Sequence, residues 1–415
     1  MAPRSRLSLT SLIIWAAVLT SPWTGVKVAG LNVCDLLIVL AFVPLTLDAL
    51  ARKRVVLLRW WMFMPTLGAL FILGIDVIIR NLSLGQQLES SGNVSGSTAA
   101  GDTGGGAIFV ARIALATLAI AILVASEVAT YGSQRGVTLL RAWTLGISVS
   151  AFATITDTYG LTNVAEYTFH QVSDFRAFGL AFHPNSLAQT IALGLPLMLL
   201  FAVRSERLIL KLFWIAGIIA GLSSLLLANS RGGLAVGFIG LIVSVLLLIQ
   251  RTKARRWGPP LILLAAIPLY FAATWLVDNT RLGGSGGANL SDVGRSAYID
   301  QGLKLFSESP IVGVGLGLGS GVSVPVLVMS SGGILFLLFY YLFIFVGWKD
   351  LFLNAKDLFY ALCFVSVTAL IVIGFLNNSV NERYDFVVVA VCAAMIASVP
   401  KEGDRVTPLR TWAPR

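Results

Sequence analysis

Arg231 lies in one of the few polar turns of an otherwise apolar chain. It follows Ser230 and precedes Gly232 and Gly233, between two long apolar runs. A guanidinium group stays charged at any ordinary pH, and its planar fork fits the oxygens of a phosphate group. Glycines at such a turn allow the backbone to approach closely. Arg231 is therefore a candidate phosphate-binding residue, and the bland alternative is a side chain that simply extends to the membrane interface.

The longest segment that is not apolar runs from Asp278 to Val326. It concentrates ionisable side chains and a tyrosine in a chain with few charges elsewhere: Arg281, Asp292, Arg295, Tyr298, Asp300, Lys304 and Glu308. A long loop in a compact protein is usually functional or disordered. We expect this segment to carry part of any chemistry, and a solvated connection is the alternative.

Both histidines lie between Asp157 and Pro184, in a segment rich in aromatic residues that suits the headgroup layer. His170 is near Asp174, and His183 directly precedes Pro184, which is well placed to begin a helix. A histidine at this boundary is a candidate general base. It could equally be an amphipathic ring at a wet boundary.

A last polar stretch, NNSVNERYD, runs from Asn377 to Asp385, and we expect Glu382 to pair with Arg383 there. Three acids fall inside early apolar runs: Asp35, Asp48 and Asp76. Each is interpreted first as a feature of packing or topology. Asp35 is expected near the outer interface and Asp48 near the inner one.

The elements that position these residues follow from composition. The 415 residues are 57% hydrophobic and 12% charged, with a mean hydropathy of +0.85, which is typical of a polytopic membrane protein. Unbroken apolar runs of about 20 residues predict helices and exclude the alternating strands of a β-barrel. About twelve spans are predicted: Ser8 to Trp23, Leu31 to Leu50, Trp60 to Ile79, Ala107 to Val128, Thr138 to Thr158, Asn185 to Val203, Leu208 to Leu227, Leu234 to Gln250, Pro259 to Val277, Leu327 to Trp348, Leu358 to Phe375 and Phe386 to Val399.

Charge predicts the orientation of these spans. Most of the 30 basic residues fall on one side of an alternating model, which the positive-inside rule assigns to the cytoplasm together with both termini. The net charge of +10 is explained in this way, and no clustered basic face indicates a nucleic-acid partner. The first span is interpreted as a retained helix, the Gly- and Ser-rich stretch from Asn81 to Gly106 as a flexible linker, and Cys34, Cys363 and Cys392 as buried thiols.

Four stretches carry a family resemblance: AFGLAFHPNSLAQTIALGLPL, LLLANSRGGLAVGFIGLIV, GRSAYIDQGLKLFSESPIVGVGLG and SSGGILFLLFYYLFIF. Their order and spacing, from Ala177 to about Phe345, resemble the O-antigen ligase and polymerase family of bacterial envelope glycosyltransferases. The resemblance implies an all-α, GT-C-like polytopic fold with an extended outer-face loop. It also implies three parts: residues 1–174 with the first five spans, a ligase/polymerase-like core at 175–345 with the loop 278–326, and 346–415 with the last spans and a cytoplasmic tail.

The same resemblance implies a metal-independent, cofactor-free enzyme in the cytoplasmic (inner) membrane, with its active site on the outer face. Its donor would be a glycan on polyprenyl diphosphate, and its acceptor another glycan or a lipid-anchored core. Arg231 and Arg295 match the family's arginines and form the predicted diphosphate clamp, which can stabilise the charge on the leaving group without a metal. The candidate bases are His170, His183, Asp174 and Glu382. The candidate substrate-binding residues are Asn185, Ser230, Tyr298, Lys304 and Arg383.

The sequence departs from the ligases at one point. Residues Ser320 to Gly333 lack the histidine that ligases carry after the Gly-rich stretch, so the sequence leaves ligase and polymerase open. A transporter or flippase for a lipid-linked or soluble solute is the alternative from another class. Transporters tend to place ionisable groups at mid-membrane and to repeat their architecture, and no internal repeat is visible. A catalytically inactive scaffold is the third possibility.

Overall fold

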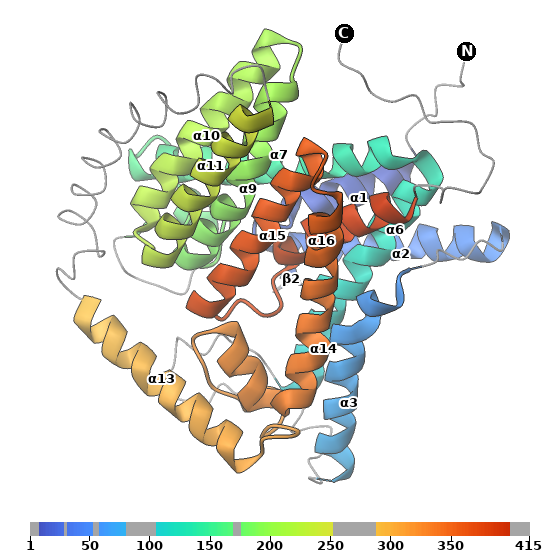
Figure 1. Cartoon of the computed structure of the whole chain (residues 1–415), viewed down its shortest axis with the longest axis vertical. Helices are drawn as coiled ribbons and strands as arrows, with labels where there is room; N and C mark the ends of the chain where they lie inside the picture. Colours follow the sequence, from blue (N-terminus) through green and yellow to red (C-terminus); the bar gives the residue numbers. More distant parts are fainter. Residues whose placement is uncertain are drawn as a thin grey trace.

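The structure is a computed structural model, and it describes residues 8–28, 31–52, 58–79, 105–168, 176–251 and 288–398, with the backbone alone at 48–52 and 288–292. This part of the chain is almost entirely helical (Figure 1). Within it, only the short strands β1 (Lys27–Val28) and β2 (Leu31–Asn32) pair, in antiparallel fashion. The prediction of an all-α, polytopic membrane protein is confirmed.

The helices of the N-terminal half are α1 (Leu9–Thr20), α2 (Val33–Arg52), η1 (Trp60–Phe63), α3 (Met64–Ile78), α5 (Gly106–Ile113), η2 (Ala114–Ala119), α6 (Ile120–Tyr131), α7 (Ser133–Thr158) and α8 (Val164–Tyr167). Those that follow are α9 (Pro184–Arg204), α10 (Leu208–Ala228), α11 (Arg231–Arg251), α13 (Ala288–Glu308), α14 (Val324–Asn354), α15 (Leu358–Leu376) and α16 (Arg383–Ala397).

Every predicted span that falls on described residues coincides with a helix, whereas Pro259 to Val277 lies outside them. In the described chain, 8 helices are long and apolar enough to cross a membrane. Two predicted spans are shorter than the roughly 20 residues that a crossing needs. α1 has 12 residues and α16 has 15. The short α16 is buried among the other helices of the bundle.

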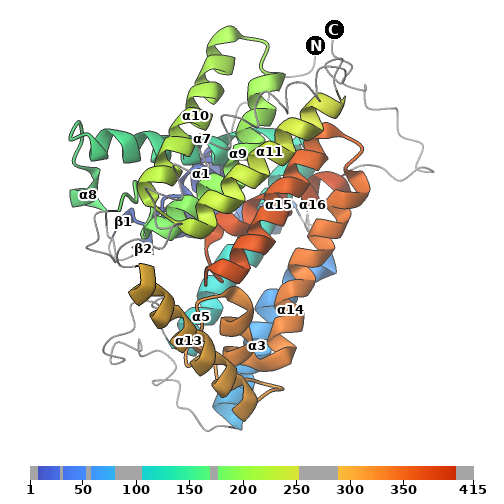
Figure 2. The same ribbon diagram turned by 60° about the vertical axis from the view of Figure 1, so that its left-hand side comes forward.

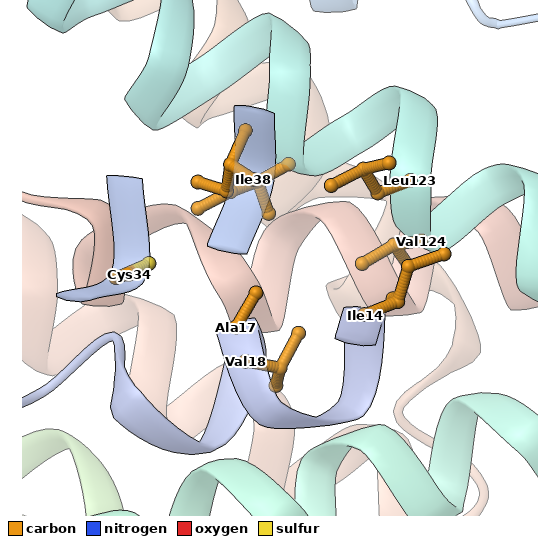
Figure 3. Close-up of a pocket in the computed structure, with 8 residues that line it drawn as sticks. Ile14, Ala17, Val18, Cys34, Ile38, Leu123 and Val124 are labelled. Carbon is orange, nitrogen blue, oxygen red and sulfur yellow. The ribbon is translucent and has the colours of Figure 1, made fainter. Parts of the chain in front are cut away.

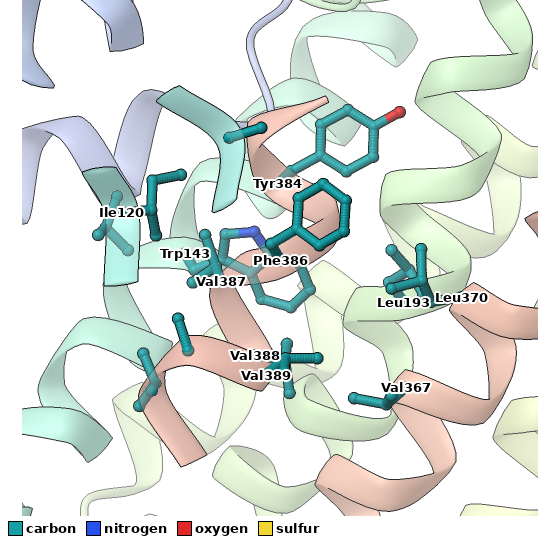
Figure 4. Packing of buried hydrophobic residues seen from close by; sticks show 14 of the residues in the cluster. Ile120, Trp143, Leu193, Val367, Leu370, Tyr384, Phe386, Val387, Val388 and Val389 are labelled. Atoms are coloured by element: carbon teal, nitrogen blue, oxygen red, sulfur yellow. The ribbon is translucent and has the colours of Figure 1, made fainter. Parts of the chain in front are cut away.

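α16 and α9 form the centre of the bundle. All residues of α16 from Arg383 to Met395 are buried, and α9 is buried along most of its length. Figure 4 shows Tyr384 and Phe386 of α16 gathered with Trp143 of α7. These three are among the largest fully buried side chains of the described chain. The core is therefore a helix of the C-terminal third wrapped by helices from both halves.

α13 lies at one end of the bundle, next to the start of α14 (Figures 1 and 2). We call this the α13 end. At the opposite end, α9 finishes at Arg204 and α15 begins at Leu358, and the Arg204 Nη2 to Asp357 Oδ1 distance is 3.3 Å. Arg59 pairs with Asp350 there as well. The charges of the opposite end thus meet in ion pairs that join neighbouring helices.

The α1 to α6 packing contributes two further features. Glu127 of α6 accepts hydrogen bonds from Ser11 Oγ at 2.8 Å and Arg135 Nε at 2.6 Å, which ties α1 to the turn between α6 and α7. A small crevice between α1, α2 and α6 is lined by apolar side chains, including Ile14, Ile38 and Leu123 (Figure 3). This crevice holds no polar lining group that could orient a substrate.

Candidate functional site

The α13 end gathers the first residues of α9, α11, α14 and α16. The Asn377 amide, just after α15, donates to Gln189 Oε1 of α9 at 2.8 Å. The Gln189 amide in turn donates to Asp385 Oδ1 of α16 at 2.7 Å. The Val324 N–H, which begins α14, donates to Asn377 O at 3.1 Å. These helix beginnings therefore meet around the end of α15, where their first N–H groups lack partners within their own helices.

Arg231 begins α11 and is half-buried. The tight turn before it is possible because Asn229 adopts a left-handed conformation with φ of 47°, a state that asparagine tolerates better than most residues. Ser230 is buried, and its carbonyl accepts from the Leu234 N–H at 2.8 Å. A Cβ at Gly233 would lie 2.3 Å from Ala188 Cβ, so this glycine lets α11 press against α9. The sequence prediction of a close approach at these glycines is met.

Arg295 lies on α13 and reaches the same place from the other side. Its Nη1 donates to Leu376 O at 3.4 Å. Gly232, next to Arg231, faces the Leu376 side chain, because a Cβ there would lie 3.1 Å from Leu376 Cδ1. The two predicted arginines therefore come from segments that meet at one residue, Leu376. The role of the two arginines as a clamp stays a prediction.

α13 is held in place at its middle by the segment that follows it, residues 309–323, which we call the Gly-rich segment. Ser320 Oγ donates to Gln301 Oε1 at 3.3 Å. A Cβ at Gly302 would lie 2.3 Å from Ser320 O, so α13 rests directly on this backbone. Because a helix is a stiff rod, this contact fixes where Arg295, about two turns away, is directed.

α14 is broken at Gly333, which has φ of 65° and ψ of −166°. The Gly-rich segment supplies the hydrogen bonds that the break removes. The Val314 and Gly315 N–H groups donate to Ser330 O and Ser331 O at 2.9 and 3.0 Å. The N–H groups of Ile334 and Leu335 donate to Pro310 O and Ile311 O. A broken helix at membrane depth needs such partners, because lipid offers none. The predicted single span from Leu327 to Trp348 is therefore interrupted.

Asp76 of α3 also holds the Gly-rich segment. It is fully buried, and its Oδ2 accepts from the Leu316 N–H at 2.9 Å. The expectation of a packing feature agrees with this contact. Asp76 fastens the Gly-rich segment to the N-terminal half of the chain.

Arg383 pairs with Asp35 of α2, with its Nε and Nη2 at 2.6 and 2.5 Å from the two carboxylate oxygens. Both residues are buried. The prediction that Arg383 pairs with Glu382 is wrong, because Asp35 of α2 binds the Arg383 guanidinium with both carboxylate oxygens. Its predicted role in substrate binding stays a prediction.

The remaining candidates are placed as follows. His183 caps α9, and its Nδ1 accepts from the Asn185 N–H at 3.0 Å. Tyr298 is half-buried on α13, and Lys304 is exposed on the same helix. His170 and Asp174 lie outside the described residues. The Nζ of Lys27 lies 4.6 Å from the centre of the Phe182 ring.

Gln189 and Asn377 were not singled out from the sequence, although they link the helix beginnings at this end. A lone glutamine in the apolar run of α9 was the available signal, because polar side chains in such runs usually bridge helices. Asp385 belongs to the same network through Ser379, whose Oγ donates to Asp385 Oδ2 at 2.8 Å. Among the described residues, no group of three or more His, Cys, Asp or Glu side chains is arranged to hold a metal ion.

Comparisons with known proteins locate the resemblance in the same region. Residues 216–324 match the family model described as O-antigen ligase. The matched segment contains Arg231, Arg295 and the Gly-rich segment that positions α13. No curated protein matches the chain. The family implies a membrane enzyme of the ligase or glycosyltransferase type. The match, on a polytopic helical fold, supports assignment of this chain to the O-antigen ligase/polymerase family.

Proposed function

We propose that this protein transfers or polymerises a glycan carried on polyprenyl diphosphate, with Arg231 and Arg295 as the diphosphate clamp. The observation that carries the proposal is the convergence of the two arginine-bearing segments at Leu376. The acceptor is a second lipid-linked glycan or a lipid-anchored core.

The electrostatics of the α13 end support an anionic leaving group. The first turns of α9, α11, α14 and α16 direct the positive ends of their dipoles to this end. Helix beginnings with unpaired N–H groups are ready anion sites, and discontinuous membrane helices use them in this way. Arg231 adds a permanent charge at the first residue of α11, so dipole and side chain act together.

Preorganisation supports the same chemistry. Departure of a diphosphate develops negative charge on the bridging oxygen, and cationic donors already in place stabilise that charge without reorganising. Arg295 sits on a helix fixed by Gly302 and Ser320, so little movement is needed to present it. The chain's own arginines supply the charge stabilisation in this proposal.

Charge distribution supports the α13 end as the outer face. The opposite end carries Arg59, Arg204, Arg251, Lys349 and Lys356, which belong to the basic set that the positive-inside rule places in the cytoplasm. The isoprenoid chain would then lie along the lipid-facing helices and deliver its diphosphate to the α13 end from the side.

The clamp is tested with purified protein in liposomes and the lipid-linked glycans extracted from the cells that make it. Arg231→Ala and Arg295→Ala should each lower the transfer rate about 100- to 1,000-fold, the usual loss for one preorganised charge-stabilising donor. Arg204→Ala, at the opposite end, is the matched control and should stay near wild type. Equal losses in all three variants would contradict the clamp.

A binding measurement separates the clamp from the choice of sugar. Polyprenyl diphosphate, the product of transfer, should bind wild type more tightly than polyprenyl monophosphate does, and Arg231→Ala should reduce that preference. Movement of solute across the liposome membrane with no new glycosidic bond would instead support a transporter.

A further inference from the structure

The side chain of Glu382 contains an acceptor that the fold leaves unused. Glu382 precedes α16 as its N-cap residue, and its Oε2 is buried without a hydrogen bond from any described residue. Burying such an oxygen unpaired costs about 1–3 kcal/mol, and more when it is charged. Such an oxygen is rare in a native fold, and a catalytic role is one of the reasons for keeping it.

Several charged groups on different elements face the Glu382 carboxyl. Cations come from β1, α5 and α16, and the anions and the phenol from α2 and α16: Lys27, Arg112, Arg383, Asp35, Asp385 and Tyr384. Burial raises the pKa of the Glu382 carboxyl, the three cations lower it and Asp35 raises it further. A carboxylate whose pKa is raised is a stronger base than an ordinary one.

The segment that carries Glu382 is fixed on both sides. The Tyr340 hydroxyl donates to Val380 O at 3.0 Å. Arg383 is held by Asp35, and its Nη1 also donates to Asn381 O at 3.2 Å. Backbone on each side of Glu382 is therefore anchored, which is the support that a functional side chain requires.

The segment that carries Glu382, residues 377–385, folds back toward Arg231 and Arg295. The amide of Gln189 contacts Asn377 with its oxygen and Asp385 with its nitrogen, at 2.8 and 2.7 Å. The two ends of the 377–385 segment are thus joined through one side chain. Since Asn377 directly follows Leu376, Glu382 lies on a short loop that starts and finishes beside the clamp.

We propose that Glu382 is the general base that takes the proton of the acceptor hydroxyl, an inference that rests on the proposed function. The hydroxyl oxygen attacks the anomeric carbon of the donor and forms the new glycosidic bond. The bond between that carbon and the phosphate oxygen breaks, and its electron pair leaves with the polyprenyl diphosphate held by Arg231 and Arg295. The hydroxyl proton moves to Oε2 of Glu382, so acceptor and donor are handled by adjacent parts of one end.

The test compares Glu382→Gln, Glu382→Asp and Glu308→Gln in the liposome transfer assay. Glutamine keeps the shape but cannot take a proton, so Glu382→Gln should lower the transfer rate about 100- to 10,000-fold. Binding of polyprenyl diphosphate should change less than about twofold, because the clamp is intact. Glu382→Asp should recover part of the rate. Glu308, exposed on α13 of the same end, provides the control with a wild-type rate.

The pH profile gives a second, independent readout. A base works in its ionised form, so the wild-type rate should rise with pH through the pKa of Glu382 and level above it. Because burial raises that pKa, the rise should lie above the range of an ordinary carboxyl. Glu382→Gln should lose this rise and Glu308→Gln should keep it.

Three results overturn the inference. If the transfer rate of Glu382→Gln is within about threefold of wild type while Arg231→Ala is inactive, Glu382 is not the general base. The proposed glycan transfer is not contradicted by that result. A loss of polyprenyl diphosphate binding that matches the loss of rate makes Glu382 a structural residue. Absence of any transfer by the wild-type protein removes both the proposed function and the base.

Discussion

The two ends of the bundle use their arginines differently. At the opposite end, Arg204 faces Asp357 and Arg59 faces Asp350, while Arg251 donates to the backbone carbonyls of Ala355 and Lys356. At the α13 end, Arg383 pairs with Asp35, but Arg295 reaches the carbonyl of Leu376 and Arg231 opens α11 beside that residue. Arg59, Arg204 and Arg383 thus join separate segments through ion pairs, whereas Arg231 and Arg295 lie on segments that meet at Leu376.

The difference also appears in the backbone. The opposite end has regular helices and exposed ion pairs, while the α13 end contains the broken α14, the Gly-rich segment and the orphan oxygen of Glu382. Natural proteins keep such local irregularities mainly where function requires them. The contrast agrees with the proposal that the α13 end is the part of the protein that acts on a substrate.

Breaking the Asp35–Arg383 pair should give the largest loss of stability. Asp35→Ala leaves a buried guanidinium without its bidentate partner, and such changes cost about 3–5 kcal/mol. Thermal unfolding in detergent measures it. An apolar pair, Asp35→Leu with Arg383→Met, should recover most of the loss, because the two charges no longer need each other. If Asp35→Ala unfolds at the same temperature as wild type, the Asp35–Arg383 pair contributes nothing to stability.

Gly333→Ala should come next. Any side chain at φ of 65° and ψ of −166° is strained by roughly 1–3 kcal/mol, and the new Cβ would lie 2.2 Å from Ile311 O. We expect the Gly-rich segment to shift and the transfer rate to fall with it. Gly74→Ala on α3 is the matched control, since nothing lies within 4 Å of the added Cβ and alanine favours the helix. Equal transfer rates for Gly333→Ala and Gly74→Ala would show that the break in α14 is not needed for transfer.

Arg204→Ala should have the smallest effect. Its partner Asp357 is more than half exposed, and exposed ion pairs contribute about 0–1 kcal/mol. The change in unfolding temperature should be near the error of the measurement and should shrink further in high salt. If Arg204→Ala lowers the unfolding temperature as much as Asp35→Ala does, the ion pairs of the two ends do not differ in their contribution to stability.

The sequence predicted the helices because hydrophobic length is a local property. The expected span from Leu208 to Leu227 corresponds to α10, which ends one residue later at Ala228. It did not predict the break at Gly333, because a short Ser-Ser-Gly-Gly stretch inside a long apolar run is compatible with an unbroken helix. The break depends on hydrogen bonds from a segment about 20 residues earlier, which no local pattern contains.

The candidate site was predictable in its residues and not in its contacts. Arg231 and Arg295 could be named from their neighbours in the sequence, and their roles remain predictions. Arg383 was expected to pair with the adjacent Glu382, whereas its partner is Asp35, 348 positions away. A buried charged side chain can pair with a residue next to it in the sequence or with a distant one. The packing of the helices determines which of the two it contacts.

The break in α14 constrains how the protein is made. Ser330 O, Ser331 O and the N–H groups of Ile334 and Leu335 find their partners only in the segment that leaves the ribosome before them. Inserting α14 alone into lipid would expose those four groups to a solvent that cannot bind them. We therefore expect the Gly-rich segment and α14 to enter the bilayer together and not one after the other.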